Sequence, residues 1–155
     1  MLILPSASGI LFRAISPGTT ASGTKLDTAY LEFVNGDPIT PPDIYPADSL
    51  AYYDQLATTS DRDYLRVPIL SHTVKQGTDG QSILSLIIVS DGETGVHGKP
   101  FSASSRSRIY GLALLASQSN ERTDMLFARH YYGPNEQLEK CADAGVMLSF
   151  DLFFS

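Results

Sequence analysis

Apolar and polar residues alternate most regularly over residues 145–155, at the end of the sequence. A period of two places alternate residues on the same face of an extended segment. The face predicted to be buried carries Val146, Leu148, Phe150, Leu152 and Phe154. Between them lie Met147, Ser149, Asp151 and Phe153, on the opposite face. A terminal strand with so apolar a face must be covered by the rest of the fold.

Further apolar runs predict more strands. Residues 108–117 and 124–132 form a meander, joined by a polar hairpin connection slightly longer than usual. Residues 81–90 are apolar on both faces, which predicts a central strand or one covered on two sides. Residues 30–34, 64–71 and 137–141 predict shorter strands, and Pro68 favours an edge position or a bulge because proline lacks a backbone donor.

Three segments interrupt these strands. Residues 37–46 contain four prolines and predict an extended crossover. A short helix follows, capped by Asp48 or Ser49 and running through about Ala57, with one apolar face. Residues 91–107 are rich in Gly and Ser and predict a long loop, which passes over a surface or is clamped by a partner.

Seven or so short strands with one short helix predict a mainly β protein, an antiparallel β-sandwich with a jelly-roll-like arrangement. We assign residues 26–155 to this sandwich domain. Residues 1–25 are an N-terminal arm or loop, apolar at first and then rich in Ser, Thr and Gly. Such an arm could order on a neighbouring subunit, and a plain surface loop leading into the first strand is the alternative.

Composition narrows the partners. The chain has 155 residues, enough for one domain with a real core, and a net charge of -6 with scattered basic residues, which argues against nucleic acid. No stretch approaches the roughly 20 apolar residues of a membrane helix, and the opening residues lack the basic start of a signal peptide. We therefore expect no membrane partner and folding in cytoplasm. The single cysteine, Cys141, excludes an intrachain disulfide and is expected to be a buried thiol.

Motifs that carry chemistry are missing, so we expect neither an enzyme nor a cofactor. The histidines, His72, His97 and His130, do not form a close-spaced ligand motif. Residues 95–99 have the wrong spacing for a phosphate loop, and residues 91–95 lack the ligands of an EF-hand. An incidental metal ion in the loop of residues 91–107 stays open. Asp61 and Asp63 are better explained by local capping and ion pairing than by acid–base catalysis.

Tyrosine and arginine supply the candidate interface residues. Tyrosine is favoured in protein interfaces because it combines apolar area with a polar tip. The candidate tyrosines are Tyr45, Tyr52, Tyr53, Tyr131 and Tyr132. Arg106 and Arg108 are the candidate arginines; together with Arg129 they could pair with carboxylates of a neighbouring subunit. Core packing of the tyrosines and intrachain pairing of the arginines are the alternatives.

The order of several segments resembles that of small β-rich structural proteins of tailed bacteriophages. The segments are Tyr52-Tyr53, then residues 63–68, 92–98, 109–115, 126–132 and 137–140, and the alternating final strand. The resemblance covers roughly residues 26 to 155, as a pattern of strands and turns. It implies a virion component present in many copies, in the tail, baseplate or fibre-attachment region or as capsid decoration. It also implies assembly in the host cytoplasm with itself and with other virion proteins, and no reaction.

Two other functions remain open from the sequence. A carbohydrate-binding module would present aromatic rings such as Tyr131 and Tyr132 to sugars, although the chain has no Trp. A hydrolase would need residues that meet only in the fold, for instance His97 with Asp91 or Ser102.

Overall fold

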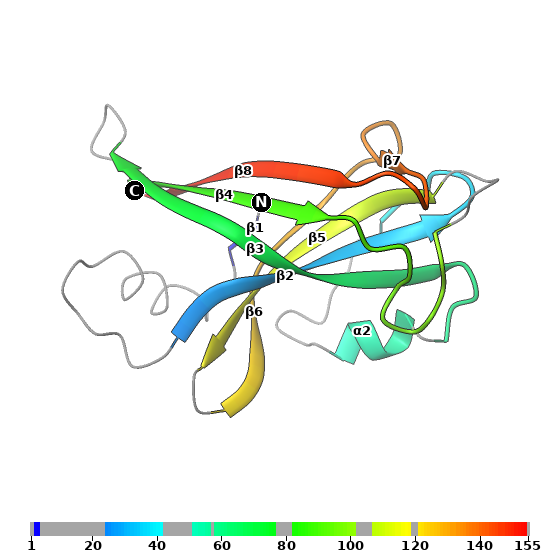
Figure 1. Cartoon of the computed structure of the whole chain (residues 1–155), viewed down its shortest axis with the longest axis horizontal. Helices are drawn as coiled ribbons and strands as arrows, with labels where there is room; N and C mark the ends of the chain where they lie inside the picture. Colours follow the sequence, from blue (N-terminus) through cyan, green and yellow to red (C-terminus); the bar gives the residue numbers. More distant parts are fainter. Residues whose placement is uncertain are drawn as a thin grey trace.

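The computed structural model describes residues 2–3, 24–41, 51–56, 58–76, 82–101, 107–118 and 121–154 (Figure 1). Within these ranges the chain is mainly β, and the one helix, α2 (Ala51–Leu56), is short. The strands are β1 (Leu2–Ile3), β2 (Thr24–Asn35), β3 (Arg62–Gln76), β4 (Ser82–Ser90), β5 (Ser107–Gln118), β6 (Glu121–Tyr131), β7 (Leu138–Lys140) and β8 (Val146–Phe154). The predicted fold class is confirmed.

All strand pairs are antiparallel, in the order β1-β6-β5-β2-β3-β4-β8, with β7 paired to β5 off this path. The sheet is curled, so that the half formed by β6, β5 and β2 and the half formed by β4 and β8 cross in Figure 1. A sandwich-like arrangement therefore arises from one sheet that folds over on itself.

Strand β3 belongs to both halves. Its first part pairs with β2, from Val34↔Arg62 to Thr28↔Pro68, and its second part pairs with β4 from Ile69 onward. The register shifts between Ile69 and Ser71, directly after Pro68. A strand that moves from one sheet to another does so through a bulge or bend, and proline fits there because it has no backbone donor to lose. Of the two expectations for Pro68, the bulge is therefore correct, and β3 is not an edge strand.

The main core lies between the two halves. Alternate residues of β2 (Ala29, Leu31 and Phe33) and of β4 (Leu84, Leu86 and Ile88) belong to one buried cluster, which also includes residues of β3, β5, β6 and β8. Burying an apolar side chain of this size stabilises the fold by about 1.5–3 kcal/mol. Two residues of the final strand, Leu148 and Leu152, are buried in this cluster.

A second buried cluster lies on the other face of β2, where α2 packs. It contains Tyr52, Tyr53 and Leu56 of α2 together with Tyr30 and Ala113 from the sheet, among others. The half of the sheet that contains β2 and β5 is thus covered on both faces. The half that contains β4 and β8 packs its inner face against the main core, and its outer face bears exposed residues such as Ile87 and Met147.

Several expectations about the strands need correction. Strand β5 extends to Gln118 and β6 begins at Glu121, with these two residues paired, so most of the polar residues expected in a hairpin connection belong to strands. Backbone pairing extends these strands beyond their apolar residues, which alone marked them in the sequence. Strand β4 lies between β3 and β8, so of its two alternatives the central position is correct. Its outer face is open, since Ile87 is 38% exposed.

Cys141 was expected to be buried and is exposed. It follows β7, where the neighbouring Lys140 is the buried residue. Because successive strand residues point to opposite faces, the inward position of Lys140 directs Cys141 outward. The expected helix caps, Asp48 and Ser49, lie outside the described residues, as does most of the segment 1–25.

Candidate functional site

The outer face of β2 carries a buried carboxylate beneath α2. Glu32 is fully buried, and its Oε1 accepts hydrogen bonds from the hydroxyls of Tyr53 at 2.8 Å and Tyr131 at 3.0 Å. Its Oε2 is also buried and has no hydrogen-bond partner among the described residues. Tyr53 comes from α2 and Tyr131 from the end of β6, so one carboxylate oxygen ties the helix to two strands.

Burial dominates the electrostatics of this cluster. It raises the pKa of Glu32 above its ordinary value, although the hydrogen bond from Tyr53, the charge of Arg129 and the hydrogen bond from Tyr131 oppose the rise. Burial and the charge of Glu32 together raise the pKa of Tyr52 to about 12 and also raise the pKa of Tyr53. These phenols therefore stay protonated at neutral pH and act as hydrogen-bond donors.

Arg129 of β6 supplies the positive charge. It is buried, and its guanidinium carbon lies 5.2, 5.5 and 5.7 Å from the ring centres of Tyr52, Tyr53 and Tyr131. Burial disfavours its charged form, but attraction to Tyr53, Tyr131 and Glu32 outweighs this, so its pKa is raised. A cation against aromatic faces is attracted by the ring quadrupoles. Within the described residues Arg129 therefore serves an intrachain cluster, which was the alternative to pairing with a neighbour.

A glycine makes room for this cluster. The register between β2 and β5 shifts between Glu32 and Phe33, which face Gly111 and Ile109. A Cβ at Gly111 would lie 2.7 Å from the ring of Tyr131 and 3.1 Å from Oε2 of Glu32. The bulge and the missing side chain together admit the tyrosine and the carboxylate. The result is a closed brace for α2, because Glu32 and Tyr53 are inaccessible to solvent.

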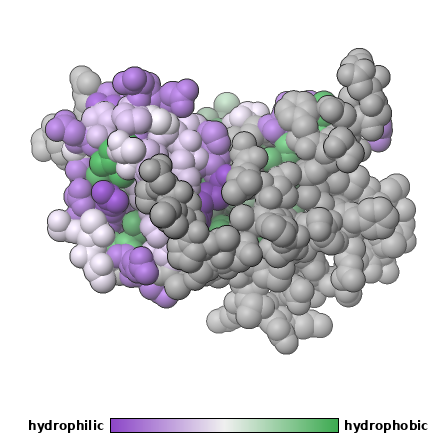
Figure 2. Space-filling model, turned by 180° about the vertical axis from the view of Figure 1, so that it is seen from behind, coloured by the Kyte–Doolittle hydropathy of each residue, from purple (hydrophilic) through white to green (hydrophobic). Residues whose placement is uncertain are grey.

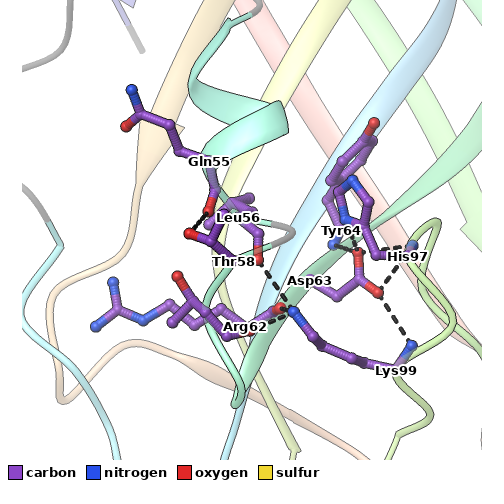
Figure 3. A network of polar contacts seen from close by, with 9 residues as sticks. Gln55, Leu56, Thr58, Arg62, Asp63, Tyr64, His97 and Lys99 are labelled. Atoms are coloured by element: carbon purple, nitrogen blue, oxygen red, sulfur yellow. Dashed lines mark hydrogen bonds and ion pairs between the residues drawn. The ribbon is translucent and has the colours of Figure 1, made fainter.

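A second polar network joins the start of β3 to the loop of residues 91–101 (Figure 3). The buried carboxylate of Asp63 accepts hydrogen bonds from the backbone N–H groups of His97 and Lys99, at 3.0 and 3.2 Å from Oδ2. Nδ1 of His97 lies 2.9 Å from Oδ1 of the same carboxylate. A Cβ at Gly95 would overlap the Asp63 side chain, so the loop approaches this closely only because residue 95 is glycine.

Lys99 extends the network to α2. Its Nζ donates to the carbonyl oxygens of Leu56 at 3.1 Å, of Arg62 at 2.9 Å and of Thr59. Figure 3 shows its side chain reaching from the loop to the end of the helix. Helix carbonyls at the C-terminus lack intrahelical partners, and a lysine there satisfies them. The loop expected to pass over a surface or be clamped by a partner is clamped by the chain itself in its described part.

His97 therefore pairs with Asp63, and not with Asp91 as the hydrolase hypothesis proposed. Ser102 lies outside the described residues. Asp63 was expected to serve local capping and ion pairing, but its contacts with His97 and Lys99 join it to a loop 34 to 36 residues further along the chain. Among the described residues, no group of three or more His, Cys, Asp or Glu side chains is placed to hold a metal ion. The same part of the chain contains no helix long and apolar enough to cross a membrane.

Two other buried polar side chains brace loops. Nζ of Lys140 donates to the carbonyl oxygens of Ala144 at 2.6 Å and Cys141 at 3.2 Å and lies 4.4 Å from the ring centre of Phe101. Burial lowers its pKa. Gln137 accepts from the N–H of Ile39 at 3.1 Å and donates to the carbonyl of the same residue. Its side-chain amide thus bonds both backbone groups of Ile39, as the backbone of a neighbouring strand would, and fixes the segment after β2.

The candidate interface residues have different surroundings. Tyr45 and Arg106 lie outside the described residues. Tyr52 and Tyr53 of α2 are buried against the sheet. Tyr131 is half-buried, and its hydroxyl donates a hydrogen bond to Glu32. Arg108 pairs with Glu139 at 3.0 Å, an intrachain ion pair.

Tyr132 is half-buried and packs edge-on against His130. Any role of these residues at an interface stays a prediction.

Exposed apolar side chains occur instead on the half of the sheet formed by β4, β8 and the second part of β3. Met147 of β8 is 72% exposed, Leu70 of β3 is 62% exposed and Ile87 of β4 is 38% exposed. Seen from behind, the described surface is largely hydrophilic, with only small hydrophobic patches (Figure 2). Large apolar side chains that are exposed in this way are suited to contact another protein.

Two buried charged residues, Glu32 and Lys140, were not among the residues predicted to be important. For Glu32 the available signal was a charged residue between the apolar neighbours Leu31 and Phe33 in a strand, whereas Lys140 follows Glu139 and gave no such signal. Charged residues are rarely fully buried unless they are paired. A charged residue within an apolar strand therefore predicts that a partner exists, but does not show which residue it is.

Comparison of the chain with protein-family models, with curated proteins and with solved structures finds no significant match.

Proposed function

We propose that the protein is a non-enzymatic structural protein of a bacteriophage virion, a tail, baseplate or fibre-attachment component or a capsid decoration protein. It assembles with itself and with other virion proteins. The observation that supports assembly is the set of large apolar side chains exposed on β3, β4 and β8, namely Leu70, Ile87 and Met147. The proposal of a virion protein rests on the order of segments along the chain, which resembles that of phage structural proteins.

The chemistry of these exposed residues favours a protein partner. Methionine is enriched in the centres of interfaces, and its unbranched side chain adapts to an opposing surface. Met147 is 72% exposed and lies opposite Val89 in the β4–β8 register. Burial of this side chain in an assembly would contribute about 1.5–3 kcal/mol.

The internal networks support the same proposal. Glu32, Asp63 and Lys140 are all committed to contacts that fix a helix or a loop to the sheet. A virion component present in many copies needs one fixed shape in every copy, because each interface repeats the same surface. Buried polar groups whose bonds are satisfied, as those of Asp63 and Lys140 are, help to specify one arrangement.

The test is to purify phage particles that encode this chain, quantify it against the major capsid protein by mass spectrometry, and label it with antibody and gold. Near-stoichiometric copies spread over the head would support decoration, and few copies at the tail would support a baseplate or fibre role. Absence from the particles would overturn the proposal.

The described geometry does not favour the carbohydrate-binding alternative. It commits the Tyr131 hydroxyl to Glu32 and stacks the ring on Tyr110.

A further inference from the structure

Strand β8 forms one end of the sheet within the described part of the chain. It pairs with β4 along its whole length, from Ser82↔Phe154 to Ser90↔Val146, in one uninterrupted register. Its other edge pairs with no strand among the described residues, and β8 lies beside β4 in Figure 1. Such an edge presents a row of backbone donors and acceptors with the spacing of an extended strand, and only another strand matches that spacing.

This edge lacks the devices that usually keep sheets apart. Natural edge strands are protected by proline, lysine, bulges or short length. The nine residues of β8 include no proline and no lysine, and their register with β4 has no bulge. Their one charged residue, Asp151, accepts a hydrogen bond from the hydroxyl of Ser85 on β4 at 2.5 Å. One of its two carboxylate oxygens is therefore engaged by its own sheet.

The opposite end of the sheet differs. Strand β6 carries Arg122 and Arg129 in its sequence, its register with β5 shifts twice, and β1 covers part of its outer edge. The two ends of the sheet thus differ, and of the two only β8 presents a long edge with a regular register and with neither lysine nor arginine. This contrast indicates that β8 is an edge kept for pairing.

We propose that β8 pairs antiparallel with β8 of a second copy of the chain, about a two-fold axis at Phe150. The proposal rests on the self-assembly in the proposed function and names the surface that performs it. Phe150 is the middle residue of the strand, so this register pairs all nine positions. The three strands β3, β4 and β8 of each copy then form one continuous sheet.

The residues at the paired positions favour this register and this partner. Met147 stands opposite Phe153 of the second copy, Leu148 opposite Leu152, and Ser149 opposite Asp151. Apolar residues therefore face apolar residues, and a hydroxyl faces the carboxylate. A parallel in-register pair would instead place the two Asp151 residues opposite each other, which is unfavourable for like charges.

Charge substitutions at Ser149 give a two-directional test, because this exposed residue faces Asp151 of the second copy in the proposed register. Ser149→Asp creates two like-charge pairs and should raise the dimer Kd by roughly tenfold, whereas Ser149→Lys creates two opposite-charge pairs and should lower it. Thr73 is an exposed residue of β3, which is separated from β8 by β4, so Thr73→Asp should leave the dimer Kd unchanged. Sedimentation velocity over a concentration series measures all four proteins, and thermal melts check that each is folded.

Cross-linking tests the register directly. Ser149→Cys and Asp151→Cys are prepared separately, each in a Cys141→Ser background. A disulfide requires Cα atoms about 4.4–6.8 Å apart, so a mixture of the two variants should form a cross-linked dimer under mild oxidation, and neither alone should do so. A wild-type chain that stays monomeric, equal Kd values for all Ser149 variants, or no cross-link in the mixture would each overturn the inference.

These results are independent of the particle test. A monomeric chain found in virions would overturn only the β8 pairing, and a β8 dimer absent from virions would overturn only the proposed function.

Discussion

Removing the Glu32 carboxylate should release α2 from the sheet. Glu32→Ala deprives the hydroxyls of Tyr53 and Tyr131 of their acceptor and leaves Arg129 buried without the nearby negative charge. A buried hydroxyl left unsatisfied costs about 1–3 kcal/mol, and breaking a buried charge pair costs about 3–5 kcal/mol. Because the three groups share one network, these effects are not additive. We expect a total loss of about 3–5 kcal/mol.

Single hydroxyl deletions calibrate that value. Tyr53→Phe and Tyr131→Phe each remove one hydrogen bond to the carboxylate, for which we expect a loss of about 1.5–3 kcal/mol. Tyr132→Phe is the matched control, since Tyr132 neighbours Tyr131 in sequence and packs on His130. Its change should stay within about 0.5 kcal/mol. Urea unfolding followed by circular dichroism measures the free energy of unfolding of each variant.

The pH dependence gives an independent readout. Burial raises the pKa of Glu32, so the folded chain binds this proton more tightly than the unfolded chain does. The resulting stabilisation is complete below the unfolded pKa, near 4.5, and is lost as the pH rises through the raised folded pKa. Glu32→Gln keeps an acceptor oxygen and cannot titrate. The free energy of unfolding of the wild type should therefore fall relative to Glu32→Gln across that window.

Two results would refute this reasoning. A loss below about 1 kcal/mol in Glu32→Ala would mean that the carboxylate does not brace the helix. A constant difference between wild type and Glu32→Gln from acidic to neutral pH would mean that burial does not raise the pKa of Glu32.

Other substitutions test the remaining contacts. Gly111→Ala should cost about 1–3 kcal/mol in urea unfolding, because its Cβ would overlap the Tyr131 ring, whereas Gly133→Ala should change stability by less than about 0.5 kcal/mol; equal effects would contradict the close approach. Lys99→Met should cost about 1.5–3 kcal/mol and speed proteolysis of the α2–β3 connection, and the exposed Lys75→Met serves as its control. Cys141 should react fully with a thiol reagent in the native protein, and reaction only after unfolding would show a buried thiol.

The sequence predicted the strands better than their partners. The regular alternation of apolar and polar residues predicted β8, and the spacing of apolar residues on one helical face predicted α2. Both patterns are local in the sequence. The pairing of β5 with β2 joins residues such as Ile109 and Phe33, far apart in the chain. No local pattern specifies such a pairing, and the same limit hid the division of β3 between β2 and β4.

The site was harder to predict, because the type of a residue does not determine whether its side chain points to the interior or to the surface. Tyr52 and Tyr53 were candidate interface residues, yet α2 turns both toward the sheet. Their aromatic character fits either place. The interior is favourable for the Tyr53 hydroxyl because Glu32 accepts its hydrogen bond, and the Tyr52 hydroxyl lies 3.3 Å from that of Tyr110. Arg108 likewise found its partner, Glu139, across the β5–β7 pair, which the spacing of the two residues in sequence does not indicate.

The two halves of the sheet differ in what remains available for contact. Around β2 and β5, the main core covers one face and α2 covers the other, with Glu32 fixing the helix in place. Around β4 and β8, the main core covers the inner face, while Ile87 and Met147 stay exposed on the outer one. One half is thus fixed by buried charges, and the other carries exposed apolar side chains among polar ones such as Ser149 on its outer face. The proposed β8 pairing would use this second half. We therefore expect Glu32→Ala to lower the free energy of unfolding and to leave the dimer Kd of the folded chain unchanged. Charge substitutions at Ser149 should change the dimer Kd and leave the free energy of unfolding nearly unchanged.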